Sequence, residues 1–205
     1  MSDDRQALVI ACGALAHEIV ALQKLNGWDA LKVQCIPASI HNTPDKIPAA
    51  VSAIIDRARP HYQQIFVAFA DCGTGGLLDQ LLQKEKIERL TGAHCYEFYA
   101  GSENFSQMAE ETPGTFYLTD FLARHFDRLI LEELGIKKHP ELLQMYFGNY
   151  EKLVHLAQTQ QPALQELARE AALALGLPYE YRYTGFGQLE PELRQVNERL
   201  IQWQN

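Results

Sequence analysis

The residues best suited to chemistry are four cysteines spread over the first half of the chain, Cys12, Cys35, Cys72 and Cys95. Thiolates bind zinc and iron centres, and an activated thiolate also acts as a nucleophile. No Cys-x-x-Cys pair, the usual spacing signal for a metal site, is present. Free cysteine is also among the most buried residue types, so thiols that only pack in a core are the structural alternative.

The expected strands bring most of these cysteines to one place. Three fall at the carboxyl end of an apolar run that predicts a β-strand, namely Cys12 in 7–12, Cys35 in 31–36 and Cys72 directly after 64–70. Ligands of open parallel sheets bind outside the carboxyl ends of the strands. Cys95 lies near the start of an expected strand over 94–99, so it joins the others only if that strand is short or bent.

Two histidines are candidates to complete such a site. His41 lies in the loop after the second expected strand, and His94 directly precedes Cys95. Because neighbours on a strand point to opposite faces, His94 and Cys95 are not expected to serve one site together. The metal hypothesis therefore has three thiolate ligands and a fourth ligand from one of two residues: Cys12, Cys72 and Cys95, with Cys35 or His41. The ion would be zinc or an iron centre, an iron–sulfur cluster included, with a corrinoid ranked behind them.

A glycine-rich segment, Asp71-Cys72-Gly73-Thr74-Gly75-Gly76, joins the third expected strand to an expected helix over 77–86. Glycines at such a junction let the backbone approach a ligand, and a helix N-terminus favours negative charge. The segment matches neither the dinucleotide fingerprint nor the P-loop, because Leu77 stands where the P-loop has lysine. We expect it to bind an anionic part of a substrate and expect the helix dipole to lower the pKa of Cys72. A tight structural turn is the alternative.

Two further polar residues are candidates. Glu97 lies two residues from Cys95 on the expected strand, so both side chains would share a face, and Glu97 could act as an acid or base. A salt-bridged carboxylate explains Glu97 equally well. Asn42 could orient a ligand, although asparagine before Pro44 more commonly shapes a turn.

The elements that must position these residues alternate between strand and helix over the first hundred residues. Helices are predicted over 14–26, 43–59 and 77–86 between the strands. The second half, from about residue 119, is richer in helix: a strand over 115–118, helices over 120–134, 140–158 and 162–175, a strand over 179–183 and a helix over 189–203. The pattern predicts a single α/β domain over residues 1–205, a mainly parallel, Rossmann-like three-layer sandwich with additional C-terminal helices.

Composition excludes several classes of function. The chain has 205 residues and a formal net charge of −8, which argues against general binding of nucleic acid or of anionic membranes. No apolar run approaches the roughly 20 residues needed to cross a bilayer. The start, Met-Ser-Asp-Asp-Arg, lacks the profile of a signal peptide. We therefore expect a cytoplasmic protein, in which thiols stay reduced.

Several segments together resemble an uncharacterised family, domain of unknown function 1638. The resemblance is carried by ACGALAHE (11–18), CIPASIHNTPDKIP (35–48), FADCGTGGLLD (69–79), GAHCYEFYAG (92–101), GTFYLTDFL (114–122) and MYFGNY (145–150). Members are similar in being cytosolic bacterial or archaeal proteins, and some archaeal ones accompany corrinoid-dependent methyl-transfer systems. The resemblance implies a tie to one-carbon chemistry and assigns no catalytic residue.

Three hypotheses for the function follow. The leading one is a metal-thiolate enzyme or cofactor-handling protein, a metal-dependent transferase or hydrolase acting on a small molecule in methyl-transfer metabolism. The second is a metal-free enzyme in which Cys72 is the nucleophile and His41 or His94 its base. The third is a non-catalytic module that holds a small ligand or a metal for delivery to another protein.

Overall fold

The computed structural model describes residues 6–202 of the chain, with the side chains of residues 6–199. The chain divides into two compact units: unit 1 contains residues 1–98 and 188–205, and unit 2 contains residues 99–187. The short helix α4 (Cys95–Ala100) spans the boundary. The expectation of a single domain stays a prediction.

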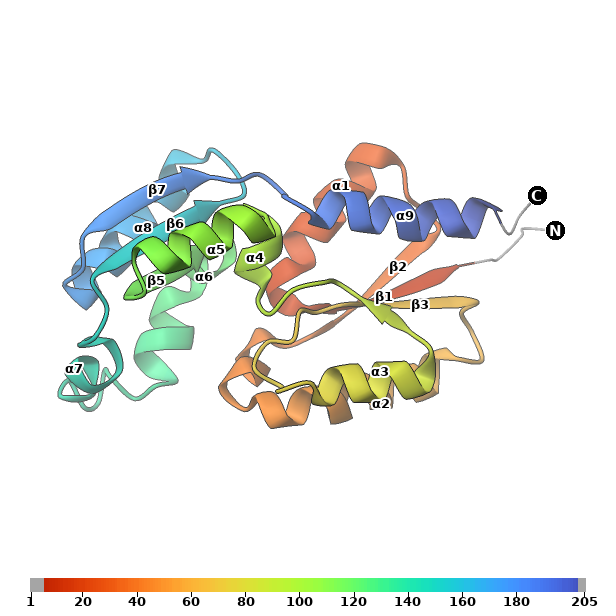
Figure 1. The fold of residues 1–205 in the computed structure, drawn as a ribbon, viewed down its shortest axis with the longest axis horizontal. Coiled ribbons are helices and arrows are strands. Elements are labelled where there is room, and N and C mark those ends of the chain that lie inside the picture. Colours follow the sequence, from red (N-terminus) through yellow and green to blue (C-terminus); the bar gives the residue numbers. More distant parts are fainter. Residues whose placement is uncertain (1–5, 203–205) are drawn as a thin grey trace. The chain divides into compact units, whose positions relative to one another are not determined.

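Unit 1 is built on a four-stranded parallel sheet in the order β2-β1-β3-β4. The strands are β1 (Ala7–Cys12), β2 (Leu31–Ile36), β3 (Gln64–Ala68) and β4 (Glu88–Arg89). The helices are α1 (Ala16–Asn26), α2 (Ile47–Ala58), α3 (Leu77–Glu85) and α9 (Leu189–Gln202). Figure 1 shows α1 and α9 on one face of this sheet and α2 and α3 on the other. Unit 1 therefore confirms the expected Rossmann-like, three-layer α/β arrangement.

The central strand explains why the sheet needs helices on both faces. Every residue of β1 is buried, as expected for an apolar strand between two parallel neighbours. The helix α2 supplies a matching stripe of buried residues at helical spacing, which includes Ile47, Val51 and Ile55. Gly27 ends α1 in the left-handed conformation, with φ of 65°.

Unit 2 contains a separate three-stranded parallel sheet in the order β5-β6-β7. Its strands are β5 (Thr115–Thr119), β6 (Lys152–Ala157) and β7 (Tyr179–Tyr183). Its helices are α5 (Ser102–Glu111), α6 (Asp120–Phe126), α7 (Leu142–Phe147) and α8 (Pro162–Leu175), and a π-helical segment over Asp127–Glu132 continues α6. A buried core includes Leu118, Leu153 and Ala168, and α6 and α8 pack together against the sheet. Thr119 caps α6, because its side chain accepts a hydrogen bond from the backbone N–H of Leu122.

Two predicted elements are wrong. The segment 94–99, predicted as a strand, forms α4, and the fourth strand of the sheet is the two-residue β4 instead. The carbonyls of Gly92 and Ala93 accept hydrogen bonds from the backbone N–H groups of Asp71 and Cys72, so the chain here is fastened to the loop after β3. The helix predicted over 140–158 stops at Phe147, and its last residues form β6, which pairs with strands on both sides.

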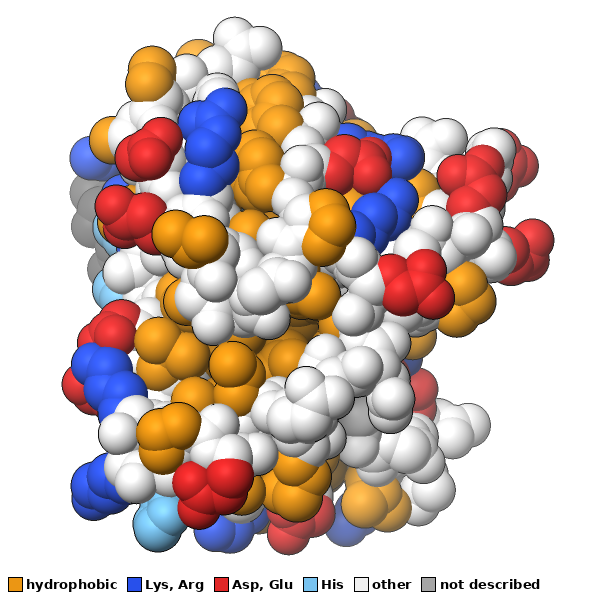
Figure 2. All heavy atoms as spheres, turned by 90° about the vertical axis from the view of Figure 1, so that its left-hand side faces the viewer, with side chains coloured by type: hydrophobic (Ala, Val, Ile, Leu, Met, Phe, Trp, Pro, Cys, Tyr) orange, Lys and Arg blue, Asp and Glu red, His pale blue; other side chains and the backbone are white. Residues whose placement is uncertain are grey.

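Large hydrophobic side chains remain exposed on unit 2, among them Met145 and Leu173. Figure 2 shows hydrophobic side chains spread over the face that looks left in Figure 1. In the aromatic group of α7 and the turn after it, Phe147 is buried, whereas Tyr146 and Tyr150 are partly exposed. Among the described helices, none combines the length and the apolar character needed to cross a bilayer.

A buried polar network joins β5, β6 and β7. Asp120, directly after β5, places Oδ1 2.8 Å from Nε2 of His155 on β6, and Nδ1 of His155 lies 3.2 Å from the hydroxyl of Tyr179. The backbone N–H and the hydroxyl of Thr159 both donate to Oδ2 of Asp120, over 2.8 and 2.7 Å. His155 and Asp120 are almost completely buried. A buried polar group is costly unless it is hydrogen-bonded, so each member depends on its partners.

Replacing Asp120 by alanine should therefore lower the free energy of unfolding by roughly 3–5 kcal/mol, since a buried partner is removed and three donors lose their acceptor. Urea denaturation followed by circular dichroism measures this change. Glu110→Ala, at an exposed position on α5, is the control and should change the value by no more than about 0.5 kcal/mol. Equal stability of the two variants would contradict the role given to Asp120.

Candidate functional site

Four loops meet at the carboxyl edge of the unit 1 sheet. A Cβ atom at Gly13, after β1, would lie 3.1 Å from the carbonyl oxygen of Ile36 at the end of β2. A Cβ atom at Gly73, after β3, would lie 3.6 Å from Cβ of Pro44. The N–H of Cys72 donates to the carbonyl of Ala93 over 2.9 Å, which ties in the loop before α4. The chain leaves β1 and β3 toward opposite faces of the sheet, and ligands of doubly wound sheets bind at such a point.

Cys12 ends β1 and is buried at this edge. Its sulfur accepts a hydrogen bond from the backbone N–H of Ala14 over 3.3 Å and lies 3.9 Å from Nδ1 of His41. Burial, with a smaller contribution from the neighbouring Cys72, raises the pKa of the Cys12 thiol to about 12. At neutral pH this thiol is therefore protonated unless a cation lies beside it.

His41 presents a neutral imidazole to the same edge. Its Nδ1 lies 2.8 Å from the carbonyl oxygen of Ala38, an acceptor, so this nitrogen carries the proton and Nε2 keeps its lone pair. Burial lowers the pKa of His41, and His94 nearby also lowers it. The ring stacks on Phe69, with the ring centres 6.1 Å apart. His41 is thus held as a base or ligand with one defined free nitrogen.

Cys72 follows β3 in the left-handed conformation, with φ of 52°. Its sulfur accepts a hydrogen bond from the backbone N–H of Ala70, yet burial outweighs this and raises the pKa of Cys72 to about 11. The expectation that a helix dipole lowers this pKa is wrong. The helix α3 begins at Leu77, beyond the glycine loop, and the effect of a helix dipole falls off within the first turn.

Cys95 is the first residue of α4. Its sulfur accepts a hydrogen bond from the backbone N–H of Tyr96. Its pKa lies well above the ordinary value, because of burial first and then because of the nearby Cys72 and Cys12. The structure therefore brings Cys12, Cys72 and Cys95 within electrostatic reach of one another, and each sulfur accepts at least one backbone N–H.

Cys35 also acts on the ionisation of Cys12, but the fold turns its side chain away from this group. The register pairs Cys12 with Ile36 and Cys35 with Ala11, so the side chain of Cys35 points to the opposite face of the sheet. Cys35 is exposed on the edge strand β2. As the side chains stand, no group of three or more His, Cys, Asp or Glu residues within the described part of the chain is arranged to hold a metal ion.

The glycine-rich loop 71–76 is closed by hydrogen bonds to the side chain of its first residue, Asp71. Oδ1 of Asp71 accepts hydrogen bonds from the hydroxyl of Thr74 over 2.6 Å and from the N–H of Gly76 over 2.9 Å. Oδ2 accepts one from the N–H of Gly75 over 3.2 Å. Partial burial acts to raise the pKa of Asp71, but these hydrogen bonds outweigh it and the net pKa is lowered. This arrangement does not support an anionic substrate at Gly75 and Gly76, because their amides already have an acceptor.

The two remaining candidates have local roles in the fold. Glu97 lies on a helix, not a strand, and so does not share a face with Cys95 two residues away. Its Oε2 instead accepts a hydrogen bond from the N–H of Ala93 over 2.7 Å, which closes the loop before α4. Asn42 is exposed in the short 3₁₀ helix Ala38–Asn42 that also carries His41.

Arg89, at the end of β4, is a site residue that the sequence did not indicate. It forms a two-pronged ion pair with Asp79, with N–O distances of 2.6 and 2.9 Å, and donates to the carbonyls of Leu90 and Gly92. Its charge acts to lower the pKa of Cys72. The signal in the sequence, one arginine in a two-residue strand, was too weak to find it.

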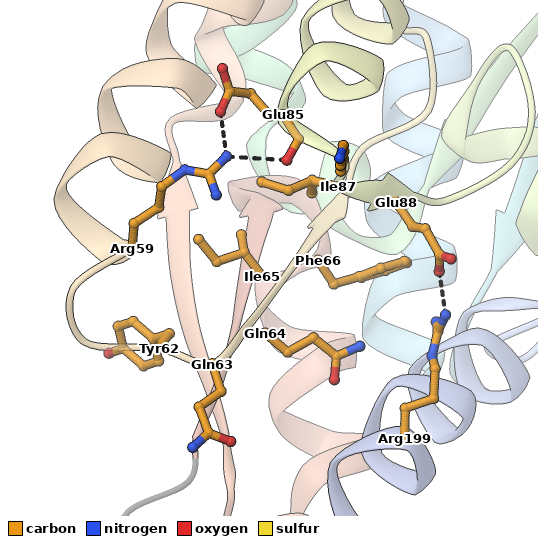
Figure 3. Close-up of a pocket in the computed structure, with 11 residues that line it drawn as sticks. Arg59, Tyr62, Gln63, Gln64, Ile65, Phe66, Glu85, Ile87, Glu88 and Arg199 are labelled. Carbon is orange, nitrogen blue, oxygen red and sulfur yellow. Dashed lines mark hydrogen bonds and ion pairs between the residues drawn. The ribbon is translucent and has the colours of Figure 1, made fainter. Parts of the chain in front are cut away.

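A cavity of about 470 Å³ lies at the opposite, amino end of β3 (Figure 3). Four of its charged residues pair across its walls, Arg59 with Glu85 and Arg199 with Glu88, as the dashed lines in Figure 3 mark. It contains none of the cysteines or histidines of the candidate site. We assign it no part in the chemistry.

Because the thiolate is the reactive form, iodoacetamide at pH 7 should modify exposed Cys35 first and Cys12 and Cys72 slowly. Partial burial also raises the pKa of Cys35, but its side chain is open to the reagent. The rate at Cys72 should rise about tenfold per pH unit until its pKa is approached. Mass spectrometry of peptides from chelator-treated protein measures each rate. Fast, selective modification of Cys72 at pH 7 would contradict the raised pKa.

Comparison with known proteins places the chain in one family. No curated protein and no solved structure matches it. A family model described as "Protein of unknown function (DUF1638)" matches residues 35–193, which include His41, Cys72 and Cys95 and begin after Cys12. Since this span is well over half of the chain, the protein belongs to the DUF1638 family.

Proposed function

We propose that the protein is a metal-thiolate enzyme in which Cys12, Cys72, Cys95 and His41 bind a zinc ion and a small molecule reacts beside it. Three sulfurs and one imidazole nitrogen are the donor set that tetrahedral zinc prefers. The side chains would have to close around the ion when it binds, since they do not surround one point as they stand. Binding that is coupled to rearrangement is common for metal sites.

The observation that carries this proposal is the shared environment of the three sulfurs. Each accepts a hydrogen bond from a backbone N–H, of Ala14 for Cys12, Ala70 for Cys72 and Tyr96 for Cys95. Such donors stabilise negative charge on sulfur and are a feature of metal-bound thiolates. Burial and mutual repulsion oppose that charge here, so a cation is the group that would balance it.

His41 is a better fourth ligand than Cys35. Metal-binding histidines commonly donate their second ring N–H to a backbone carbonyl, as Nδ1 of His41 does to Ala38. The lowered pKa keeps the imidazole neutral, which leaves Nε2 able to bind. Cys35 instead points to the other face of the sheet.

The reaction we propose is methyl transfer to the sulfur of a small molecule, in the cytoplasm, with a corrinoid-dependent methyl-transfer system as the partner. With Cys12, Cys72, Cys95 and His41 all bound, the zinc would have no open position, so a substrate thiol would have to displace His41, which would take up the thiol proton. Zinc bound by the three thiolates would then supply the Lewis acidity that holds the substrate thiol deprotonated near neutral pH. Around it, His41 and Phe69 form one stacked wall, and Arg89 adds positive charge beside Cys72. The family resemblance supports the link to one-carbon chemistry.

A metal-free enzyme with Cys72 as the nucleophile is less well supported. At a pKa of about 11, only about one thiol in ten thousand is ionised at pH 7. A module that only binds a ligand or metal uses the same residues as our proposal and differs from it in having no turnover.

Elemental analysis of the full-length protein, purified without oxygen, should find about one zinc per chain, as expected for a single site with three thiolates and one imidazole. Cys12→Ser, Cys72→Ser and Cys95→Ser should each lose the metal, because each removes one of three thiolate ligands. Cys35→Ser, at an exposed cysteine on the other face, is the matched control and should keep it. Visible colour would point to iron or a corrinoid. Active protein without metal would refute the proposal, and metal without turnover would favour the binding module.

Zinc binding should also release protons, because thiols with a pKa of about 11 to 12 are protonated near neutral pH. About three protons per zinc should appear at pH 7, one for each cysteine, and His41 should contribute none because it is already neutral. The apparent affinity should therefore rise with pH. Calorimetry in buffers of different ionisation enthalpy counts the protons. Release of none would show that the thiols are not the ligands.

A further inference from the structure

A second candidate site lies in unit 2, on the face of its sheet away from the core. One face of β5 and β6 packs against α6 and α8, and α5 covers only part of the other, where the ring of Phe105 lies 5.0 Å from that of Tyr117 on β5. The part over β6 and β7 is left as a cavity of about 420 Å³, within the size range of small-molecule sites. It borders the carboxyl ends of these two strands, where parallel sheets commonly bind ligands.

The helical wall of this cavity offers hydrogen-bond acceptors and one negative charge. Asn104, Gln107, Met108 and Glu111 follow one another at helical spacing along α5 and all line it. The amide nitrogen of Asn104 donates to the carbonyl of Ala100 over 3.1 Å, and that of Gln107 donates to Oε1 of Glu111 over 2.8 Å. Within the part of the chain that the structure describes, the side-chain oxygens of Asn104 and Gln107 and the second carboxylate oxygen of Glu111 are left to meet a ligand. Such a wall suits an ammonium group.

The strand wall carries the opposite charge. Nε of Arg182 donates to Oε1 of Glu180 over 2.5 Å, and Oε2 of Glu180 binds Nζ of Lys152 over 2.9 Å. Two cations thus share one carboxylate, which leaves a net positive charge on this side. The pair uses Nε, so among the described contacts the two terminal nitrogens of Arg182 stay open to a carboxylate, which an arginine binds with two parallel hydrogen bonds.

Between these walls the cavity also has an apolar part, although most of its exposed lining is polar. Met108 and Leu156 are buried, and Ala100 also contributes. A ligand that carries an ammonium, a carboxylate and an apolar side chain on one carbon would meet all three surfaces. We infer that this cavity binds a free α-amino acid with an apolar side chain, with Glu111 facing its ammonium and Arg182 its carboxylate. The cavity shares no residue with the cysteine site, so this inference stands apart from the proposed function.

The test is isothermal calorimetry of the full-length protein with the twenty common amino acids, each at up to about 10 mM. We expect saturable binding of leucine, methionine or phenylalanine and weaker binding of aspartate and lysine. Glu111→Gln and Arg182→Gln should each weaken binding by about tenfold, because each removes a charged partner. Glu110→Gln, one residue along α5 and outside the cavity lining, is the matched control and should bind as the parent protein does.

N-acetylation of the ligand removes its ammonium and leaves its carboxylate, so the contact with Glu111 can be tested separately from the contact with Arg182. The acetylated amino acid has no ammonium, so it should bind more weakly to the parent protein and be indifferent to Glu111→Gln. Glu111 is exposed near the end of α5, so this variant decides the question even if Arg182→Gln fails to fold. Binding of none of the twenty amino acids, or binding that Glu111→Gln leaves unchanged, would overturn the inference.

Discussion

The parallel pairing of β1 with β2 and β3 is the constraint on which the candidate site depends. Since β1 is buried along its whole length, its register to both neighbours is set by apolar packing, and the three carboxyl ends must emerge together. Cys12, the loop of His41 and Cys72 reach one edge for this reason. The loop before α4 is then fastened to the same edge by the carbonyls of Gly92 and Ala93, which brings Cys95. Residues 83 positions apart in the chain thus act on one another's ionisation.

The parts of the fold that were predicted correctly are those with a strong local pattern. The continuous apolar runs of β1 and β3 each specify an extended backbone within a few residues. The wrong predictions lie in segments whose secondary structure depends on pairing with strands that are distant in the sequence. The segment 94–99 is rich in aromatic residues that favour strands, yet it forms α4 after a loop whose carbonyls bind the backbone of Asp71 and Cys72. Leu153 and its neighbours instead pair with strands on both sides and form β6 rather than a helix.

The same division holds for the candidate site. Proximity of the sulfurs could be anticipated from strand ends, but their ionisation could not, because desolvation depends on side chains from several elements. Glu97 and Asp71 were predicted as functional groups and prove to hold loops, through contacts with backbone N–H groups that no spacing rule reveals. Asp120 and His155 are 35 residues apart and meet only through the pairing of β5 with β6, so no local motif marks them.

The backbone conformation at Cys72 has a cost in stability. A left-handed conformation costs an ordinary residue roughly 1–2 kcal/mol, and glycine almost nothing. Glycine stands at the next position and at two more positions within the same loop. Position 72 nevertheless holds cysteine, although glycine would remove the strain there. A loop selected for its shape alone would be more stable with glycine there. Position 72 thus keeps a thiol at the expense of stability.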